Sequence, residues 1–148
     1  MNELMIIVGT RPEVIKMAPV IRALQNRGHG FTFVYSGQHY DYNLSLQFIE
    51  ELELPQPTHS LKLQHSSPGH QTGRMLIDLG RIMEKEKPRL LLVAGDTHSA
   101  LAAALAANKQ RVLIVHVDAG LRSFDLRMPE EHNRCIVDHI SDYLFAPT

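Results

Sequence analysis

The sequence predicts an α/β protein built on a doubly wound parallel sheet. Short apolar runs, such as residues 4–8 and 90–94, alternate with longer stretches of helical periodicity along the 148 residues, which is the pattern of strands joined by crossover helices. The runs are apolar at nearly every position, as expected of strands that helices cover on both faces. Charged and polar residues gather directly after them. The length suits one domain with its own core.

The first strand and helix are predicted near the N-terminus. Residues 4–8 form an apolar run that ends at Gly9, and Pro12 suits the first turn of the helix that follows. Apolar residues then recur at helical spacing up to a pair of glycines. Pro19 lies inside this pattern. Because proline removes a backbone donor, we expect the helix to kink at Pro19 or to start in earnest near it.

The middle of the chain predicts two further strands and two helices. Aromatic and β-branched residues at 31–35 indicate a strand. A second helix is indicated by the spacing of Leu44, Phe48 and Ile49. Residues 55–68 contain three prolines and are predicted to be mostly loop, with a possible short strand at 60–63. The helical pattern that follows is strong and stops before Pro88.

The last third of the chain continues the alternation. Residues 90–94 and 112–117 are predicted strands, and the alanine-rich stretch 99–107 between them is a helix by propensity. A helix over about 129–139 and a strand over 143–146 complete the set. Right-handed crossovers place all the strand-to-helix loops on the carboxyl edge of such a sheet, which is where α/β proteins bind ligands.

The overall composition excludes several classes of function. A formal net charge of −1 gives no long-range attraction to nucleic acid or anionic membranes, and no apolar run approaches the ~20 residues of a membrane helix. The single cysteine, Cys135, rules out an internal disulfide, and the first residues lack the features of a signal peptide. The nine histidines are scattered without a metal-binding spacing. We therefore expect a cytoplasmic protein with no metal, no nucleic-acid partner and no membrane partner.

The first loop of the carboxyl edge predicts an anion site. Gly9 lets backbone approach a ligand, Thr10 and Arg11 add a hydroxyl and a guanidinium at a helix N-terminus, and Lys16 lies about one turn further on. The loop is neither a Walker A motif nor a G-x-G-x-x-G motif. The alternative is a tight turn in which Arg11 pairs with Glu13 and Lys16 is solvated.

A carboxylate follows the strand at 90–94. Asp96 is either the N-cap of the next helix or a functional acid at the top of a central strand. The string Gly95-Asp96-Thr97-His98 is similar to one metal-binding block of the metallophosphoesterases, but the chain lacks the Asp-x-His and Gly-Asn-His-Glu blocks that accompany it. A two-metal site is therefore disfavoured.

The segment after residues 112–117 concentrates charge. Asp118 and Arg122 could form a structural ion pair, and Glu130 and Glu131 could be first-turn acids favoured by the helix dipole, with Glu130 paired to Arg134. The convergence of three loops on one edge favours a functional interpretation instead. Acids with basic partners in a cleft are what proton transfer on an anionic substrate requires.

Four blocks of this sequence together resemble the non-hydrolysing UDP-N-acetylglucosamine 2-epimerases. The blocks occur in one order and are Gly9-Thr10-Arg11-Pro12-Glu13, Gly95-Asp96-Thr97, His116-Val117-Asp118-Ala119-Gly120-Leu121-Arg122 and Pro129-Glu130-Glu131-His132-Asn133-Arg134. The resemblance implies a GT-B architecture, in which two Rossmann-like domains face each other across a cleft. Residues 1–148 would be the N-terminal domain, and the C-terminal nucleotide-binding domain would be absent.

The resemblance also implies a reaction. UDP-N-acetylglucosamine and UDP-N-acetylmannosamine interconvert when a base removes the proton at the carbon that bears the N-acetyl group and UDP leaves. UDP and a proton then add to the resulting 2-acetamidoglucal, and the proton adds from the opposite face. The family needs no organic cofactor or metal for this chemistry.

The resemblance assigns roles to five residues. Asp96, Asp118 and Glu130 match acid-base positions of the family, and Arg11 and Lys16 match positions that bind the substrate. A cationic pair beside a departing diphosphate makes physical sense, because it stabilises the charge that develops as the bond breaks. The division of the two proton steps among the three acids stays open.

Two positions depart from the family pattern. Asp118 stands where the family usually has the longer glutamate, and a shift of about 1 Å in a catalytic group can cost on the order of a hundredfold in rate. Asp118 therefore predicts a compensating backbone shift or an altered activity. Bacterial members bind a second UDP-N-acetylglucosamine as activator near the loop that matches Gly37, Gln38 and His39. Gln38 and His39 are thus candidates for a second site, although Asp41 replaces a glutamine present in some members.

Two other functions fit part of the pattern. A noncatalytic sugar-nucleotide or anion-binding module would keep the fold and use Arg11 and Lys16, and the departure at Asp118 motivates it. A GT-B glycosyltransferase half would transfer the sugar to an acceptor, but the matched carboxylates favour epimerisation. The partners expected of an epimerase half are UDP-N-acetylglucosamine, the C-terminal domain in cis or in trans, and a second copy of the chain, because full-length relatives form homodimers. The isolated chain is expected to be inactive.

Overall fold

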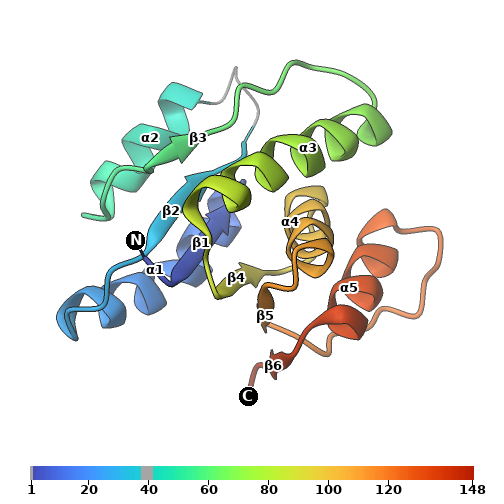
Figure 1. The fold of residues 1–148 in the computed structure, drawn as a ribbon. Helices are drawn as coiled ribbons and strands as arrows, with labels where there is room; N and C mark the ends of the chain where they lie inside the picture. Colours follow the sequence, from blue (N-terminus) through green and yellow to red (C-terminus); the bar gives the residue numbers. More distant parts are fainter. Residues whose placement is uncertain (1, 38–41) are drawn as a thin grey trace.

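The computed structural model describes residues 2–37 and 42–148, and its strands and helices alternate as predicted (Figure 1). The elements are β1 (Leu4–Val8), α1 (Arg11–Asn26), β2 (Thr32–Tyr35), α2 (Tyr42–Glu51), β3 (His59–Ser60), α3 (Pro68–Glu86), β4 (Leu90–Ala94), α4 (His98–Lys109), β5 (Leu113–Val117), α5 (Pro129–Ile140) and β6 (Tyr143–Phe145). The six strands form one sheet in the order β3-β2-β1-β4-β5-β6, and every neighbouring pair is parallel. The predicted doubly wound, Rossmann-like sheet is confirmed.

The sheet is buried between two apolar layers. Successive side chains of β1 alternate between them: Met5 and Ile7 belong to the cluster under α3 and α4, whereas Ile6 and Val8 belong to the cluster under α1. Figure 1 shows α3, α4 and α5 on one face of the sheet, with α1 on the other. This two-sided burial explains why the strands are apolar at nearly every position.

Two details differ from the predictions. The first helix begins at Arg11 and continues past Pro19, because Thr10 caps it by accepting from the Glu13 amide at 3.4 Å and a proline occupies its first turn. A start near Pro19 was therefore a wrong expectation. The short strand β3 lies at His59–Ser60 instead of 60–63. The apolar alternation that suggested residues 60–63 instead packs Leu61 and Leu63 into the core.

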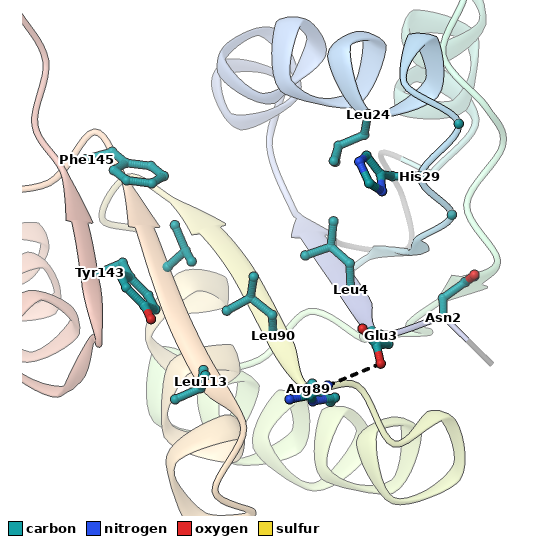
Figure 2. Close-up of a pocket in the computed structure, with 13 residues that line it drawn as sticks. Asn2, Glu3, Leu4, Leu24, His29, Arg89, Leu90, Leu113, Tyr143 and Phe145 are labelled. Carbon is teal, nitrogen blue, oxygen red and sulfur yellow. Dashed lines mark hydrogen bonds and ion pairs between the residues drawn. The ribbon is translucent and has the colours of Figure 1, made fainter.

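One part of the sheet is less covered. Leu113, Tyr143 and Phe145 are 45%, 51% and 59% exposed, and they line a hollow of about 820 Å³ (Figure 2). The hollow also takes in Leu4 and Leu90, the first residues of β1 and β4. None of the candidate site residues lines it. Within the described residues, no helix is both long and apolar enough to cross a membrane.

Candidate active site

The candidate residues converge where β1, β4 and β5 end. These three strands are neighbours in the sheet, so the loops that follow them meet at one edge. A small hollow of about 30 Å³ lies there, lined by Lys16, Gly95, Asp96, Asp118, Leu121 and Arg134. Three of the five residues proposed for catalysis or substrate binding thus share one hollow.

Asp118 is paired with Lys16 across this hollow. Lys16 lies on the second turn of α1, and its Nζ is 2.6 Å from Asp118 Oδ2. Asp118 follows β5 directly and has a φ of +66°, a left-handed conformation that aspartate tolerates better than most residues. The alternative pairing of Asp118 with Arg122 is wrong, because Arg122 binds Asp138. The turn after β5 therefore directs a carboxylate toward the first loop.

Asp96 is held by the fifth helix. Arg134 Nη2 donates to Asp96 Oδ2 at 2.7 Å, and Asn133 Nδ2 donates to the Asp96 carbonyl oxygen at 2.9 Å. The N-cap of α4 is Thr97, whose hydroxyl accepts from the Ala100 amide, so the expectation that Asp96 caps the helix was wrong. The pairing of Arg134 with a first-turn glutamate was also wrong. A buried Nε of Arg134 has no hydrogen-bond partner among the described residues.

Arg11 and Glu130 lie on the rim outside this hollow. Arg11 is exposed at the start of α1, and its guanidinium carbon is 5.5 Å from the centre of the Phe48 ring. No ion pair joins it to Glu13 among the described contacts. Glu130 is exposed in the first turn of α5. The proposed second-site residues Gln38 and His39 lie outside the described residues.

A buried hydrogen-bond network, which the sequence alone did not predict, supports the loop that carries Asp118. His116 on β5 is 1% exposed; its Nδ1 is 2.5 Å from Asp138 Oδ1, and its Nε2 is 2.7 Å from the Gly95 carbonyl oxygen. Asp138 Oδ2 accepts from the Gly120 amide and from Arg122. Burial alone would raise the pKa of Asp138, but these hydrogen bonds outweigh it and hold the pKa below its ordinary value.

Glu131 fixes the next segment of the same loop. Its Oε2 accepts from the Ser123 hydroxyl, from the Ser123 amide at 2.5 Å and from the Phe124 amide at 2.9 Å. The hydrogen bond from the Ser123 side chain is the main reason that the pKa of Glu131 is lowered to about 2. Glu131 is therefore an ionised anchor of the loop, whereas its neighbour Glu130 is exposed at the rim.

Glu13 is a second buried carboxyl group that the sequence interpretation did not use. It is 3% exposed, and its Oε2 accepts from the Gly9 amide at 2.9 Å. Burial raises its pKa to about 7, and hydrogen bonds with Thr97, Gly9 and Thr10 offset this only in part. A signal was present, because Thr10 and Glu13 have the spacing of a capping box.

The resulting arrangement suits acid-base chemistry on an anion. Two carboxylates and two cations surround one hollow, and each ion pair joins a carboxylate on a loop to a cation on a helix. Such groups can exchange a neighbouring partner for a substrate anion while the surrounding network keeps their backbone in place. Among the described residues, no group of three or more histidine, cysteine, aspartate or glutamate side chains is placed to hold a metal ion.

Comparison with known proteins gives a consistent result. The family model for UDP-N-acetylglucosamine 2-epimerase matches residues 22–148. The UDP-N-acetylglucosamine 2-epimerase of Methanocaldococcus jannaschii is 50% identical over 99% of this chain and 40% of its own length. A crystal structure of the enzyme from that organism, in complex with UDP-GlcNAc and UDP, matches with a TM-score of 0.93 and 50% identity over 100% of this chain and 41% of its own.

A relative named for a different substrate is also similar. The UDP-2,3-diacetamido-2,3-dideoxy-D-glucuronate 2-epimerase of Pseudomonas aeruginosa is 46% identical over 99% of this chain and 42% of its own length. The chain thus spans about 40% of the length of the curated relatives it matches. Because the family model covers most of the chain and the identities extend over nearly all of it, this protein belongs to the UDP-N-acetylglucosamine 2-epimerase family.

Proposed function

We propose that residues 1–148 are the N-terminal catalytic domain of an epimerase that interconverts UDP-N-acetylglucosamine and UDP-N-acetylmannosamine. The observation that carries the proposal is the single hollow in which two loop carboxylates, Asp118 and Asp96, form ion pairs with Lys16 of α1 and Arg134 of α5. Family membership supplies the substrate class. The proposed partners are the sugar nucleotide, a C-terminal domain in cis or in trans, and a second copy of the chain.

The proposed reaction consists of an elimination and its reversal. One carboxylate takes the proton from C2 of the sugar as the bond from C1 to the UDP oxygen breaks, and the electron pair of the C–H bond becomes the C1–C2 double bond of 2-acetamidoglucal. UDP then adds back at C1 while an acid returns a proton to the opposite face of C2. Asp96, Asp118 and Glu130 are the proposed acid-base residues. Lys16 and Arg11 would stabilise the negative charge on the departing diphosphate.

The proposal requires a second part of the site. The hollow is small and lies at the carboxyl edge of the sheet. The chain spans about 40% of the length of its relatives. We propose that a C-terminal domain facing this edge supplies the remaining contacts to the nucleotide and excludes water from the site. The isolated chain should therefore show negligible turnover.

The test is to complete the chain and follow the product. Residues 1–148 are fused to the remaining portion of the M. jannaschii relative, and formation of UDP-N-acetylmannosamine is followed by NMR. The fusion should turn over, and Asp118→Asn should abolish the activity while the matched variant Asp78→Asn, which removes an ion-paired carboxylate on α3, retains it. Full activity of Asp118→Asn would contradict an acid-base role for Asp118. An inactive fusion that still binds UDP-N-acetylglucosamine would support a noncatalytic binding module instead, and transfer of the sugar to an added acceptor would support a glycosyltransferase half.

A second substrate is a separate candidate. The P. aeruginosa relative, which is nearly as similar as the archaeal one, carries the name of an epimerase for UDP-2,3-diacetamido-2,3-dideoxy-D-glucuronate. Its substrate has a carboxylate and a second acetamido group. The same fusion should be assayed with both sugar nucleotides, and the higher kcat/KM identifies the substrate.

If Gln38 and His39 form a second site, their replacement should lower activation by added UDP-N-acetylglucosamine without changing the basal rate.

A further inference from the structure

The buried carboxyl group of Glu13 lies where two site-bearing segments meet. Glu13 is in the first turn of α1, three residues before Lys16. Its Oε2 accepts from the Gly9 amide at 2.9 Å, whereas its Oε1 is buried without a partner of good hydrogen-bond geometry among the described residues. The carboxyl group thus has one strong contact and one oxygen available for another.

Packing brings the loop after β1 against the start of α4. A Cβ atom placed on Gly9 would lie only 2.5 Å from Ser99 Oγ, so the absence of a side chain lets the two segments touch. Thr97, the N-cap of α4, is close enough for a side-chain hydrogen bond that lowers the pKa of Glu13. Glu13 therefore contacts the turn before its own helix and the cap of the neighbouring one.

The groups around Glu13 are nearly all neutral. Its contacts are a backbone amide from the first loop and hydroxyl groups from Thr10 and Thr97, and Lys16 is the charged side chain that acts on it within the described structure. A protonated carboxyl group would place a donor on Oε1, which can be offered to a hydroxyl oxygen. The ionised form could accept from the same hydroxyl, so either form can bond to a threonine on this side.

We propose that Glu13 is a positioning residue whose buried carboxyl group joins the loop after β1 to the N-cap of α4. Thr97 directly follows Asp96 in the sequence, and Lys16 follows Glu13 by one turn. The link therefore sets the spacing between the cation that pairs with Asp118 and the acid that pairs with Arg134. The geometric role is independent of the reaction, and only its effect on turnover rests on the proposed function.

The link is tested first by NMR on the 148-residue chain, without substrate. The amide shifts of Gly9 and Ala100 are followed from pH 5 to 8.5 in the unchanged chain, in Glu13→Gln, and in Glu84→Gln as a control at an exposed glutamate of α3. Both amides should share a titration with a midpoint near pH 7 that is lost in Glu13→Gln and kept in Glu84→Gln. Subtracting the Glu13→Gln curves removes the contributions of all other groups. A titration seen at Gly9 but not at Ala100 would overturn the link.

The effect on the site is tested in the fusion protein. Glutamine can accept from Gly9 and donate to a threonine hydroxyl, so Glu13→Gln should keep kcat within about twofold at pH 6, whereas Glu13→Ala should lower kcat about tenfold with KM less affected. Equal losses in Glu13→Gln and Glu13→Ala would contradict a positioning role. If the unchanged fusion is inactive, the proposed function fails, and the NMR titration still decides whether the link exists.

Discussion

Replacing Glu13 by glutamine should make the stability of this fold less sensitive to pH. The pKa of Glu13 is raised from 4.5 to about 7 because the carboxyl group is buried, so the folded chain holds its proton over a range in which the unfolded chain releases it. The contribution of Glu13 to folding is therefore most favourable below pH 4.5 and declines as the pH rises to about 7.

The size of this effect follows from the shift. Raising the pKa from 4.5 to about 7, at about 1.4 kcal/mol per pH unit, corresponds to roughly 3 kcal/mol in total, most of which is lost between pH 5 and 8. Glutamine resembles the neutral acid and cannot ionise. Glu13→Gln should consequently be close to the unchanged chain in stability near pH 5 and more stable than it by about 2 kcal/mol at pH 8.

Urea unfolding at several pH values measures this directly. Free energies of unfolding are compared for the unchanged chain, Glu13→Gln and the control Glu84→Gln, so that other titrating groups cancel in the differences. The difference between the unchanged chain and Glu13→Gln should grow steadily from pH 5 to 7 and then level off. A difference that is independent of pH, or one that Glu84→Gln reproduces, would refute the claim that Glu13 is buried and neutral in the folded state.

Three further outcomes are expected. Gly9→Ala should lower the free energy of unfolding by about 1–3 kcal/mol in urea titrations, because its Cβ would meet Ser99 Oγ; unchanged stability would contradict the close packing. Asp138→Asn should lower Tm at pH 7, and the loss should shrink as acid protonates the native carboxylate, whose pKa is lowered; a loss of equal size at pH 3 would count against this. Lys16→Met should change stability by less than about 1 kcal/mol, since the Lys16 side chain is 44% exposed, yet it should lower turnover of the fusion on the order of a hundredfold.

Much of the fold was predictable because its strands and helices have strong local signals. The buried strands are apolar at nearly every position, and the helices carry clear start and stop residues. The errors arose where a local pattern had two interpretations. Pro19 suggested a late helix start, but Thr10 caps α1 and the helix continues past the proline. The alternation at residues 60–63 suggested a strand, but it reflects the packing of Leu61 and Leu63 into the core.

The candidate site was predictable in its residues but not in its partners. The carboxyl edge of a parallel sheet gathers the loops, so Lys16, Asp96 and Asp118 were expected to converge, and they do. The pairing of each acid was not predictable, because the partners come from elements far apart in the sequence. Asp138 binds Arg122 from the last helix, and Arg134 binds Asp96.

The central claim is that the carboxylates of this edge move a proton at C2 of a UDP-sugar. It is tested most directly by running the fusion protein in D2O and measuring deuterium at C2 of the recovered UDP-N-acetylhexosamines by NMR. We expect deuterium to enter C2 as UDP-N-acetylmannosamine forms, and both the exchange and the product to be lost in Asp118→Asn. Product formed with the original hydrogen retained at C2, or full exchange in Asp118→Asn, would contradict it.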